Sequence, residues 1–339
     1  MIRFFVLVFL FFSIQPIWSQ LGGRAAYQFL NLVNSPKQAA LGGKLLTDYS
    51  YDPTNGLYNP ATINPEMDNQ LSLNYVNYLA DVGYGTVSYA YLWDRRTQVL
   101  QTGVTYINYG SFDGYDEQGN ATASFGGGEV AFSAGYAYAI GRTNIRVGAN
   151  AKLISSKLAD YTSLGGAIDL GAIYVNEDLQ LNIAAVVRNI GTQFTPYVDV
   201  NEKLPLEVDL GFSQRLENVP LRWHLTFENL QTWNIAFENP ARQTEDLNGN
   251  VTPEDINFID NLFRHTIIGA ELFPESALNV RLGYNFRRGE ELRVVDQRSF
   301  AGISAGFSIK LNKLRLSYGY ARYNSAASTS LFGLNIDLR

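Results

Sequence analysis

From Gln70 to the end of the chain, apolar and polar residues alternate one by one over most of the sequence. An alternation with a period of two is typical of β-strands that present one face to apolar and the other to polar surroundings. Four of the clearest apolar series are Leu278, Val280, Leu282, Tyr284 and Phe286; Leu314, Leu316, Tyr318 and Tyr320; Leu221, Trp223, Leu225 and Phe227; and Ile145, Val147, Ala149, Ala151 and Leu153. The opposite faces are rich in small polar residues and carry scattered charges, among them Arg146, Lys152, Glu207, Asp209, Arg222, Glu228, Arg281 and Arg315.

The pattern predicts about fourteen strands of roughly 8–12 residues, close to the length that a tilted strand needs to cross a bilayer. They begin near Gln70, Gly85, Val99, Glu129, Asn144, Gly165, Leu179, Leu206, Leu221, Thr266, Ala277, Phe300, Lys313 and Ser328. An even number of antiparallel strands can close into an up-and-down barrel with both ends of the chain on one side.

The connections between these strands alternate between tight and long. The tight ones are Trp93–Gln98, Gly141–Thr143, Asn176–Asp178, Glu217–Pro220, Pro274–Ser276 and Asn312. The long ones are Ser111–Gly128, Ser155–Leu164, Gly191–Pro205, Gln231–His265 and Arg288–Ser299. Outer-membrane barrels show this asymmetry, with short periplasmic turns and long extracellular loops. We therefore predict an all-β fold, a 14-stranded up-and-down transmembrane β-barrel.

A soluble β-sandwich also alternates, with its apolar face as the core. The polar faces of this chain fit a crowded lumen, where opposite charges can pair, better than a solvated sheet. The 21 Tyr, 20 Phe and 4 Trp also supply the aromatic girdles of a membrane barrel. Aromatic residues near strand ends include Tyr91, Trp93, Tyr106, Tyr109, Tyr136 and Tyr138.

The N-terminal part of the chain lacks the alternation. Residues 1–19 combine one positive charge, a short apolar run and the small Ser19, which is typical of a secretory signal peptide. Residues 20–68 are rich in Gly and Ala, with short helices expected at Ala25–Leu32 and Ser35–Leu41. We expect this segment to enter the lumen as a hatch or plug, ahead of the barrel at residues 69–339. The protein is thus expected in the outer membrane of a Gram-negative cell, after export.

Composition excludes several functions. The net charge of −6 does not favour a nucleic-acid partner, because such proteins carry a basic surface. The chain has no Cys and only two His, His224 and His265, so we expect no thiol catalysis, no metal site and no cofactor.

Three motifs suggest chemistry only weakly. Residues 302–306 match the nucleophile motif GxSxG at Ser304, but here a strand simply continues, whereas the motif needs a strand, a turn and a helix. His224 is expected in the lumen wall, and His265 at a loop edge without a companion. Residues 246–255 begin like a calcium loop, but Val251 replaces the required Gly, so a turn followed by a helix at Pro253–Phe263 is favoured. We therefore expect no enzyme.

The hatch contains two sequence motifs: residues 29–43 read FLNLVNSPKQAALGG, and Asn59, Pro60 and Ala61 follow. This resembles the FadL-like outer-membrane barrels, whose hatch contains an Asn-Pro-Ala motif and whose barrel has fourteen strands. Within that group, the Leu-Gly-Gly opening, residues 111–117 and the overall length resemble the PorQ-type barrels of the type IX secretion system, with the PorV-type barrels as longer relatives. The resemblance implies a structural role for the motif, because Pro fixes φ and Asn can bond nearby backbone.

The same resemblance implies a non-enzymatic role in an attachment complex. Its partner would be a PorZ-like surface protein, and through it PorU and PorV, beside outer-membrane lipid or lipopolysaccharide. The expected docking surface consists of aromatic residues in the long connections: Phe112, Tyr115, Phe194, Tyr197, Trp233, Phe237 and Phe263. The alternative is a FadL-type transporter, in which a hydrophobic small molecule enters past the hatch and leaves through an opening in the wall.

Overall fold

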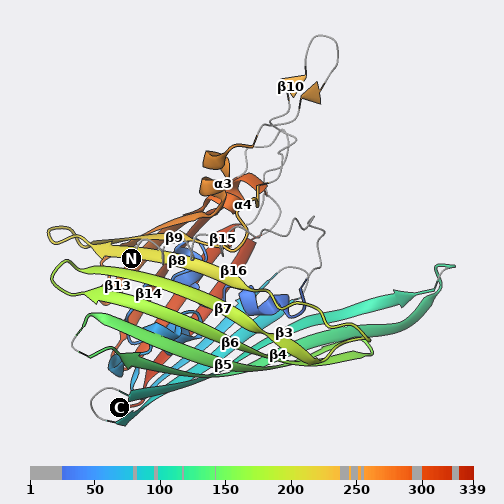
Figure 1. Ribbon diagram of the computed structural model, residues 1–339, viewed down its shortest axis with the longest axis horizontal. Helices are drawn as coiled ribbons and strands as arrows, with labels where there is room; N and C mark the ends of the chain where they lie inside the picture. The colour runs from blue at the N-terminus through green and yellow to red at the C-terminus, as the bar shows by residue number, and fades with distance from the viewer. Residues whose placement is uncertain are drawn as a thin grey trace, which may run out of the picture.

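The computed structural model describes residues 25–78, 82–94, 98–116, 118–141, 143–236, 244–245, 251–252, 256–291, 300–322 and 328–339. In this part of the chain, fourteen antiparallel strands form one closed barrel (Figure 1). The barrel strands are β1 (Gln70–Asn77), β2 (Gly83–Asp94), β3 (Gln98–Tyr115), β4 (Ala121–Ala139), β5 (Ile145–Leu158), β6 (Tyr161–Asn176), β7 (Leu181–Thr195), β8 (Glu207–Arg215), β9 (Leu221–Phe227), β12 (Thr266–Leu272), β13 (Leu278–Asn285), β14 (Ile303–Leu311), β15 (Leu314–Arg322) and β16 (Ser328–Asp337). Each barrel strand pairs with its neighbours in the chain, and β1 pairs with β16 to close the wall.

The predicted fold class is confirmed, and most strands begin within three residues of the predicted positions. The alternation was a sufficient guide because one face of each strand contacts lipid and the other contacts the filled lumen. The largest error is at β4, which begins at Ala121 rather than near Glu129.

Three of the expected long loops are wrong in their bounds, because strands continue through them. β3 and β4 extend to Tyr115 and Ala121, β5 and β6 are joined by a turn at Ala159 and Asp160, and β7 continues to Thr195. The inner faces of these extensions are polar on β5, β6 and β7, with buried Ser156, Ser163 and Gln193, and residues 121–126 of β4 are all exposed. Apolar alternation therefore no longer marks a strand there, although the backbone ladder continues.

The remaining long connections carry short elements. Between β9 and β12 lie the two-residue strands β10 (Thr244–Glu245) and β11 (Val251–Thr252) and the helix α3 (Phe258–Arg264). The expected helix at Pro253–Phe263 begins later, because Asn257 accepts hydrogen bonds from the Ile259 and Asp260 amides as its N-cap. After β13 follows α4 (Phe286–Glu291). None of the helices in the described part of the chain is long and apolar enough to span a membrane.

The outer face of the barrel is apolar and aromatic. Tyr91, Trp93, Tyr106, Tyr136 and Tyr138 are exposed there, as expected for residues at a membrane interface. Tyr109 is an exception, because its hydroxyl donates to the buried Glu129 carboxylate of the inner face.

The hatch, residues 25–68, lies inside the barrel, where it is drawn in blue in Figure 1. Among these residues only Gln28 and Glu66 are exposed. The expected helix at Ser35–Leu41 is present as α2 (Pro36–Ala40), which packs on β14 and β15. The helix expected at Ala25–Leu32 is reduced to a 3-10 turn, η1 (Gln28–Asn31), because Tyr27 has a left-handed backbone that no helix accommodates. Three further 3-10 turns are η2 (Pro53–Leu57), η3 (Pro60–Thr62) and η4 (Pro65–Met67). The predicted signal peptide, residues 1–19, lies outside the described residues.

Candidate functional site

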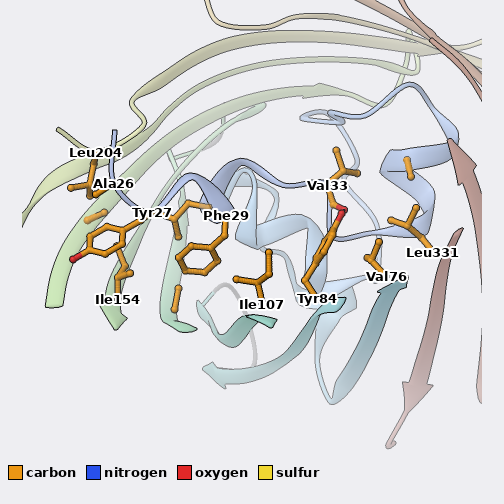
Figure 2. Close-up of a cluster of buried hydrophobic side chains, with 14 residues drawn as sticks. Ala26, Tyr27, Phe29, Val33, Val76, Tyr84, Ile107, Ile154, Leu204 and Leu331 are labelled. Atoms are coloured by element: carbon orange, nitrogen blue, oxygen red, sulfur yellow. The ribbon is translucent and has the colours of Figure 1, made fainter. Parts of the chain in front are cut away.

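An apolar chamber occupies the lumen toward the end that carries the long connections, here called the loop end. On its hatch side, Tyr27, Phe29, Leu30 and Val33 are all buried (Figure 2). The wall side is formed by inward residues of seven strands and one residue of the connection between β7 and β8: Val76, Tyr84, Ile107, Ala131, Ile154, Ala167, Leu331 and Leu204. The two sides form one continuous cluster, so hatch residues 25–33 fill the chamber.

On β1 and β5 the inner face changes from polar to apolar toward the loop end, and two smaller apolar clusters of wall and hatch residues lie elsewhere in the lumen, one with Ile173 and Val186 and one with Ala90 and Val99. On the inner face of β1, Gln70, Ser72 and Asn74 are polar, and Val76 follows them. On β5, Asn150 and Lys152 precede Ile154 in the same way. A water-filled lumen would favour polar residues at these positions. The apolar wall residues are stabilised only when an apolar segment or molecule packs against them.

Hatch residues 25–33 carry no charged side chain. Hydrogen bonds tie their backbone to the wall: the Ala26 amide donates to the Lys203 carbonyl at 2.9 Å, the Tyr84 hydroxyl to the Val33 carbonyl at 2.6 Å, and the Arg188 guanidinium to the Leu30 carbonyl at 2.7 Å. Burial of the Phe29 ring, 2% exposed, contributes roughly 1.5–3 kcal/mol. Apolar contact and backbone hydrogen bonds, one of them from the buried Arg188 cation, thus hold this part of the hatch.

Beside the chamber, the backbone ladder between β7 and β8 ends early, and side-chain hydrogen bonds from Asn189 to the Pro205 carbonyl and from the Glu202 amide to Gln193 replace it. Their ladder ends at the pair Arg188–Glu207, while β7 runs on to Thr195. At this point Asn189 adopts a left-handed backbone with φ 59°, and its amide donates to the Asp169 carboxylate at 2.8 Å. The connection then returns beside the hatch, where Lys203 pairs with Ala25 in an isolated parallel bridge. Hatch residues 25–31 therefore lie where the ladder between β7 and β8 is missing.

Below the chamber, buried ion pairs join the hatch to the wall. Lys44 of the hatch contacts three carboxylates of the wall: Glu207 at 2.9 Å, Glu228 at 3.3 Å and Asp209 at 3.4 Å. We call these four residues the Lys44 cluster. Burial alone would lower the pKa of Lys44, but the carboxylates of Asp209, Glu207 and Glu228 raise it above its usual value. Lys44 is therefore a permanent cation that joins the hatch to β8 and to the end of β9.

A second ion-pair cluster lies around α2. Lys37 contacts Asp48 of the hatch at 3.0 Å and Glu271 of β12 at 3.4 Å, and Glu271 also accepts from Arg281 at 3.1 Å. Burial would raise the pKa of Asp48, but Lys37 brings it below the usual value. A cavity beside Lys37 has a volume of about 20 Å³, room for about one water molecule. The space beside Lys37 is therefore nearly filled, although a larger pocket of about 270 Å³ lies farther down beside Tyr51 and Arg315.

The Asn-Pro-Ala motif forms a turn against the wall. The Asn59 side chain accepts from the Ala61 amide at 3.0 Å and donates to the Leu46 carbonyl at 2.8 Å. Two wall glycines leave room for it: a Cβ on Gly148 would lie 2.3 Å from the Pro60 carbonyl carbon, and one on Gly171 would lie 2.2 Å from Asn59 Oδ1. The motif therefore sets the position of the hatch relative to β5 and β6.

The aromatic residues expected to form a docking surface do not form one cluster. Phe112 and Tyr115 lie on the extended hairpin of β3 and β4, and Phe194 is exposed at the end of β7. Tyr197 turns inward, and its hydroxyl donates to Ser156 at 2.5 Å. Two more lie around the loop helices: Trp233 stacks on Phe258 and on His265, and Phe263 packs on Phe286. Phe237 lies outside the described residues.

The serine of the nucleophile motif and the two histidines make contacts that stabilise the fold. Ser304 lies within β14, and its hydroxyl donates to the Ala40 carbonyl at 3.1 Å. His224 is buried in the lumen wall, 3.7 Å from Glu271. The expectation that His265 has no companion is wrong, because its ring nitrogens lie within hydrogen-bonding distance of the Glu228 and Trp233 carbonyls. The candidate calcium loop at 246–255 lies largely outside the described residues.

The sequence analysis missed the chamber wall and the hatch cations. Val76, Ile107 and Ile154 interrupt the polar series on the inner faces of their strands, and this exchange of polar for apolar residues is a signal that the sequence does contain. Lys44 has no such signal, because its three carboxylate partners are distant in the chain.

Two solved structures are similar over nearly the whole chain. A variant of the TodX monoaromatic hydrocarbon channel, named deltaS2, has 14% identity and a TM-score of 0.53, with 90% of this chain and 97% of that chain covered. A Pseudomonas aeruginosa FadL homologue has 9% identity and a TM-score of 0.50, with 90% and 98% covered. No protein-family model and no curated protein matches the chain. At these identities the similarity concerns the fold, which is that of the FadL- and TodX-type 14-stranded outer-membrane β-barrels with an N-terminal hatch.

Proposed function

We propose that this barrel conducts a small apolar molecule, and that hatch residues 25–33 occupy its binding site until it arrives. The apolar chamber carries this proposal, because it is the largest of the three buried apolar clusters in the described residues and lies at the loop end. A segment of the chain with Phe29, Leu30 and Val33 already fills this wall, so an apolar molecule of similar shape could replace it.

The two halves of the hatch differ in how firmly they are held. Residues 25–33 have no charged side chain, whereas Lys37 and Lys44 lie in buried ion pairs. Breaking a buried ion pair costs far more than exchanging one apolar contact for another. Residues 25–33 are therefore the part that moves, and the remainder stays in place.

The gap between β7 and β8 provides the exit. Once residues 25–31 withdraw from the Lys203 backbone, the chamber meets the region where these strands are unpaired. The molecule then leaves sideways, without passing the ion pairs of Lys37 and Lys44. The TodX structure is named a monoaromatic hydrocarbon channel, which makes a monoaromatic compound a suitable first probe.

Binding of fluorobenzene to the purified barrel in nanodiscs, followed by ¹⁹F NMR, tests this function. Phe29→Ala should bind more tightly than wild type, because it empties part of the chamber, and apolar cavities of about 150 Å³ bind benzene. The matched control is Phe132→Ala, which removes an outward ring that is 54% exposed. Equal affinity of the wild type and the two variants would overturn the proposal.

A second candidate function is docking of a PorZ-like surface protein in a type IX attachment complex, with PorU and PorV as further members. The exposed aromatic residues at the loop end favour it, above all Phe112 and Tyr115. Purification from detergent-solubilised outer membranes through a tag at residues 324–327 would test it. Recovery of a PorZ-like protein that is lost when residues 231–265 are shortened would support this function, and a barrel without protein partners would contradict it.

Lipid contact is proposed for the outer face. A groove of about 980 Å³ lies over the outward Gly83 and Gly85, between aromatic residues such as Tyr75, Tyr106 and Phe332. Its apolar lining suits acyl chains of membrane lipid or lipopolysaccharide.

A further inference from the structure

The hairpin of β3 and β4 extends beyond both of its neighbours. The last pair with β2 joins Asn108 to Gly83, and the last pair with β5 joins Gly127 to Leu158. Within the described residues, 109–115 and 121–126 therefore form a two-stranded ribbon with no strand on either side. Figure 1 shows this ribbon reaching well past the other barrel strands. Both of its edges present unpaired backbone groups to solvent.

The edge of β3 is poorly suited to pair with another strand. Gly110 has a left-handed backbone with φ 78°, and the register shifts between Asn108 and Ser111. Asp113 adds a charge on the same strand. Bulges and charges of this kind are the usual protection of an exposed strand edge.

The edge of β4 has a bulge at Ala123 and Ser124 but none of the charges that protect β3. Residues 121–126 read Ala-Thr-Ala-Ser-Phe-Gly, without charge or proline, and every one is exposed. The Phe125 ring stacks on Phe112 of β3 with centroids 5.6 Å apart, which stiffens the ribbon across its width. At the barrel end of this edge, the Gly126 carbonyl accepts from the Ala159 amide at 2.9 Å, so the edge available to another strand lies beyond that bond.

The charges around this edge are mainly acidic. Between Tyr109 and Gly127 the chain has Asp113, Asp116 and Glu117 and neither Lys nor Arg. The turn between β5 and β6, in line with the free edge, adds the exposed Asp160. The nearest cation in the chain is Lys157, opposite Gly128. A second copy would bring a second acidic ribbon, so charge favours a basic partner over self-association.

We propose that the edge of β4 at residues 121–126 binds an extended, Lys- or Arg-bearing segment of a partner protein as an added strand. Backbone hydrogen bonds supply the affinity, and the acidic ribbon selects for basic side chains. The added strand continues the direction of β5 above its turn at Ala159 and Asp160. This site lies on the hairpin and is independent of the apolar chamber and its proposed transport.

The test uses the full-length barrel in nanodiscs and a short labelled peptide of alternating Lys and Val, with binding followed by fluorescence anisotropy. Two matched peptides serve as probes of mechanism: one with Glu in place of Lys, and one with the Lys sequence but N-methylated backbone amides. Hydrogen exchange of amides 121–126 reports where the peptide binds. The variant Thr122→Lys/Ser124→Lys places cations on the edge of β4, and Ser111→Lys places one on β3 as the control.

The Lys peptide should bind at least about tenfold more tightly than both matched peptides, and it should protect amides 121–126. Thr122→Lys/Ser124→Lys should lose this binding, and Ser111→Lys should keep it. Equal binding of the N-methylated peptide, or protection confined to other strands, would overturn the proposal. Protection that depends on barrel concentration without peptide would instead show a second copy at this edge. Fluorobenzene binding should be unchanged by Thr122→Lys/Ser124→Lys, so failure of the two proposals can be told apart.

Discussion

The Lys44 cluster should determine how firmly the hatch stays in the lumen. Lys44→Met removes the cation that faces Glu207, Asp209 and Glu228, all of them buried. Arg188 still contacts Glu207 at 3.0 Å, but Asp209 and Glu228 lose their nearest cation. Removal of one partner of a buried ion pair costs about 3–5 kcal/mol, because the other charge stays buried without compensation. We expect the free energy of hatch opening to fall by about this amount.

The assay uses a single introduced cysteine, since the chain has none of its own. Thr47→Cys places a thiol on the hatch three residues from Lys44, at a position only 2% exposed. Its rate of modification by a water-soluble maleimide then measures how often the hatch opens. A fall of about 3–5 kcal/mol corresponds to labelling faster by roughly a hundredfold to several thousandfold.

The control is Arg215→Met, which breaks the ion pair with Glu275 at the surface, where the two side chains are 30% and 64% exposed. Such pairs contribute about 0–1 kcal/mol, so labelling should change little. From pH 7 up to its ordinary pKa of about 10.4, the raised pKa of Lys44 keeps its contribution intact, and the contribution is lost as pH rises through the higher value in the folded protein. Labelling of Lys44→Met at pH 7 no faster than that of Arg215→Met would refute the reasoning.

Three further outcomes follow from the same contacts. Because the pKa of Asp48 is lowered in the folded protein, the stabilisation by its carboxylate is present above about pH 4 and is lost as pH falls through the lower folded value. Hydrogen exchange of the hatch amides should therefore accelerate in acid. Asp48→Asn should weaken that acceleration. Gly148→Ala should destabilise the hatch by about 1–3 kcal/mol through contact with Pro60, whereas the outward Gly83→Ala, whose Cβ would meet only the Tyr75 ring, should not; cysteine labelling at position 47 compares them. His265→Ala should cost about 1–3 kcal/mol locally, because two buried carbonyls lose a neighbour, and unchanged hydrogen exchange in α3 would contradict this.

Much of the barrel could be predicted from sequence, because strand alternation is a local property. Leu278, Val280 and Leu282 face lipid while Arg281 faces the lumen. The polarity of each residue therefore indicates on which side of the wall it lies. The same reasoning failed at Ser111–Gly128, where the ribbon is solvated on both faces and its sequence no longer alternates.

The candidate site was harder to predict, because it depends on contacts between distant parts of the chain. The apolar character of Phe29 and Val33 is visible in the sequence, but their meeting with Ile107 and Leu331 requires the closed barrel. The same holds for Lys44, whose partner Glu228 is distant in the chain, and for the gap beyond Arg188, which only the strand register shows.

The most direct test of the central claim is transport through a barrel whose hatch can be fixed at will. The pair Ala25→Cys and Lys203→Cys joins residues that are bridge partners, so a disulfide can form between the hatch and the connection from β7 to β8. Uptake of fluorobenzene into proteoliposomes should fall to the level of protein-free liposomes on oxidation and return on reduction. Equal uptake in the oxidised and reduced states, or none above protein-free liposomes in either, would contradict the account.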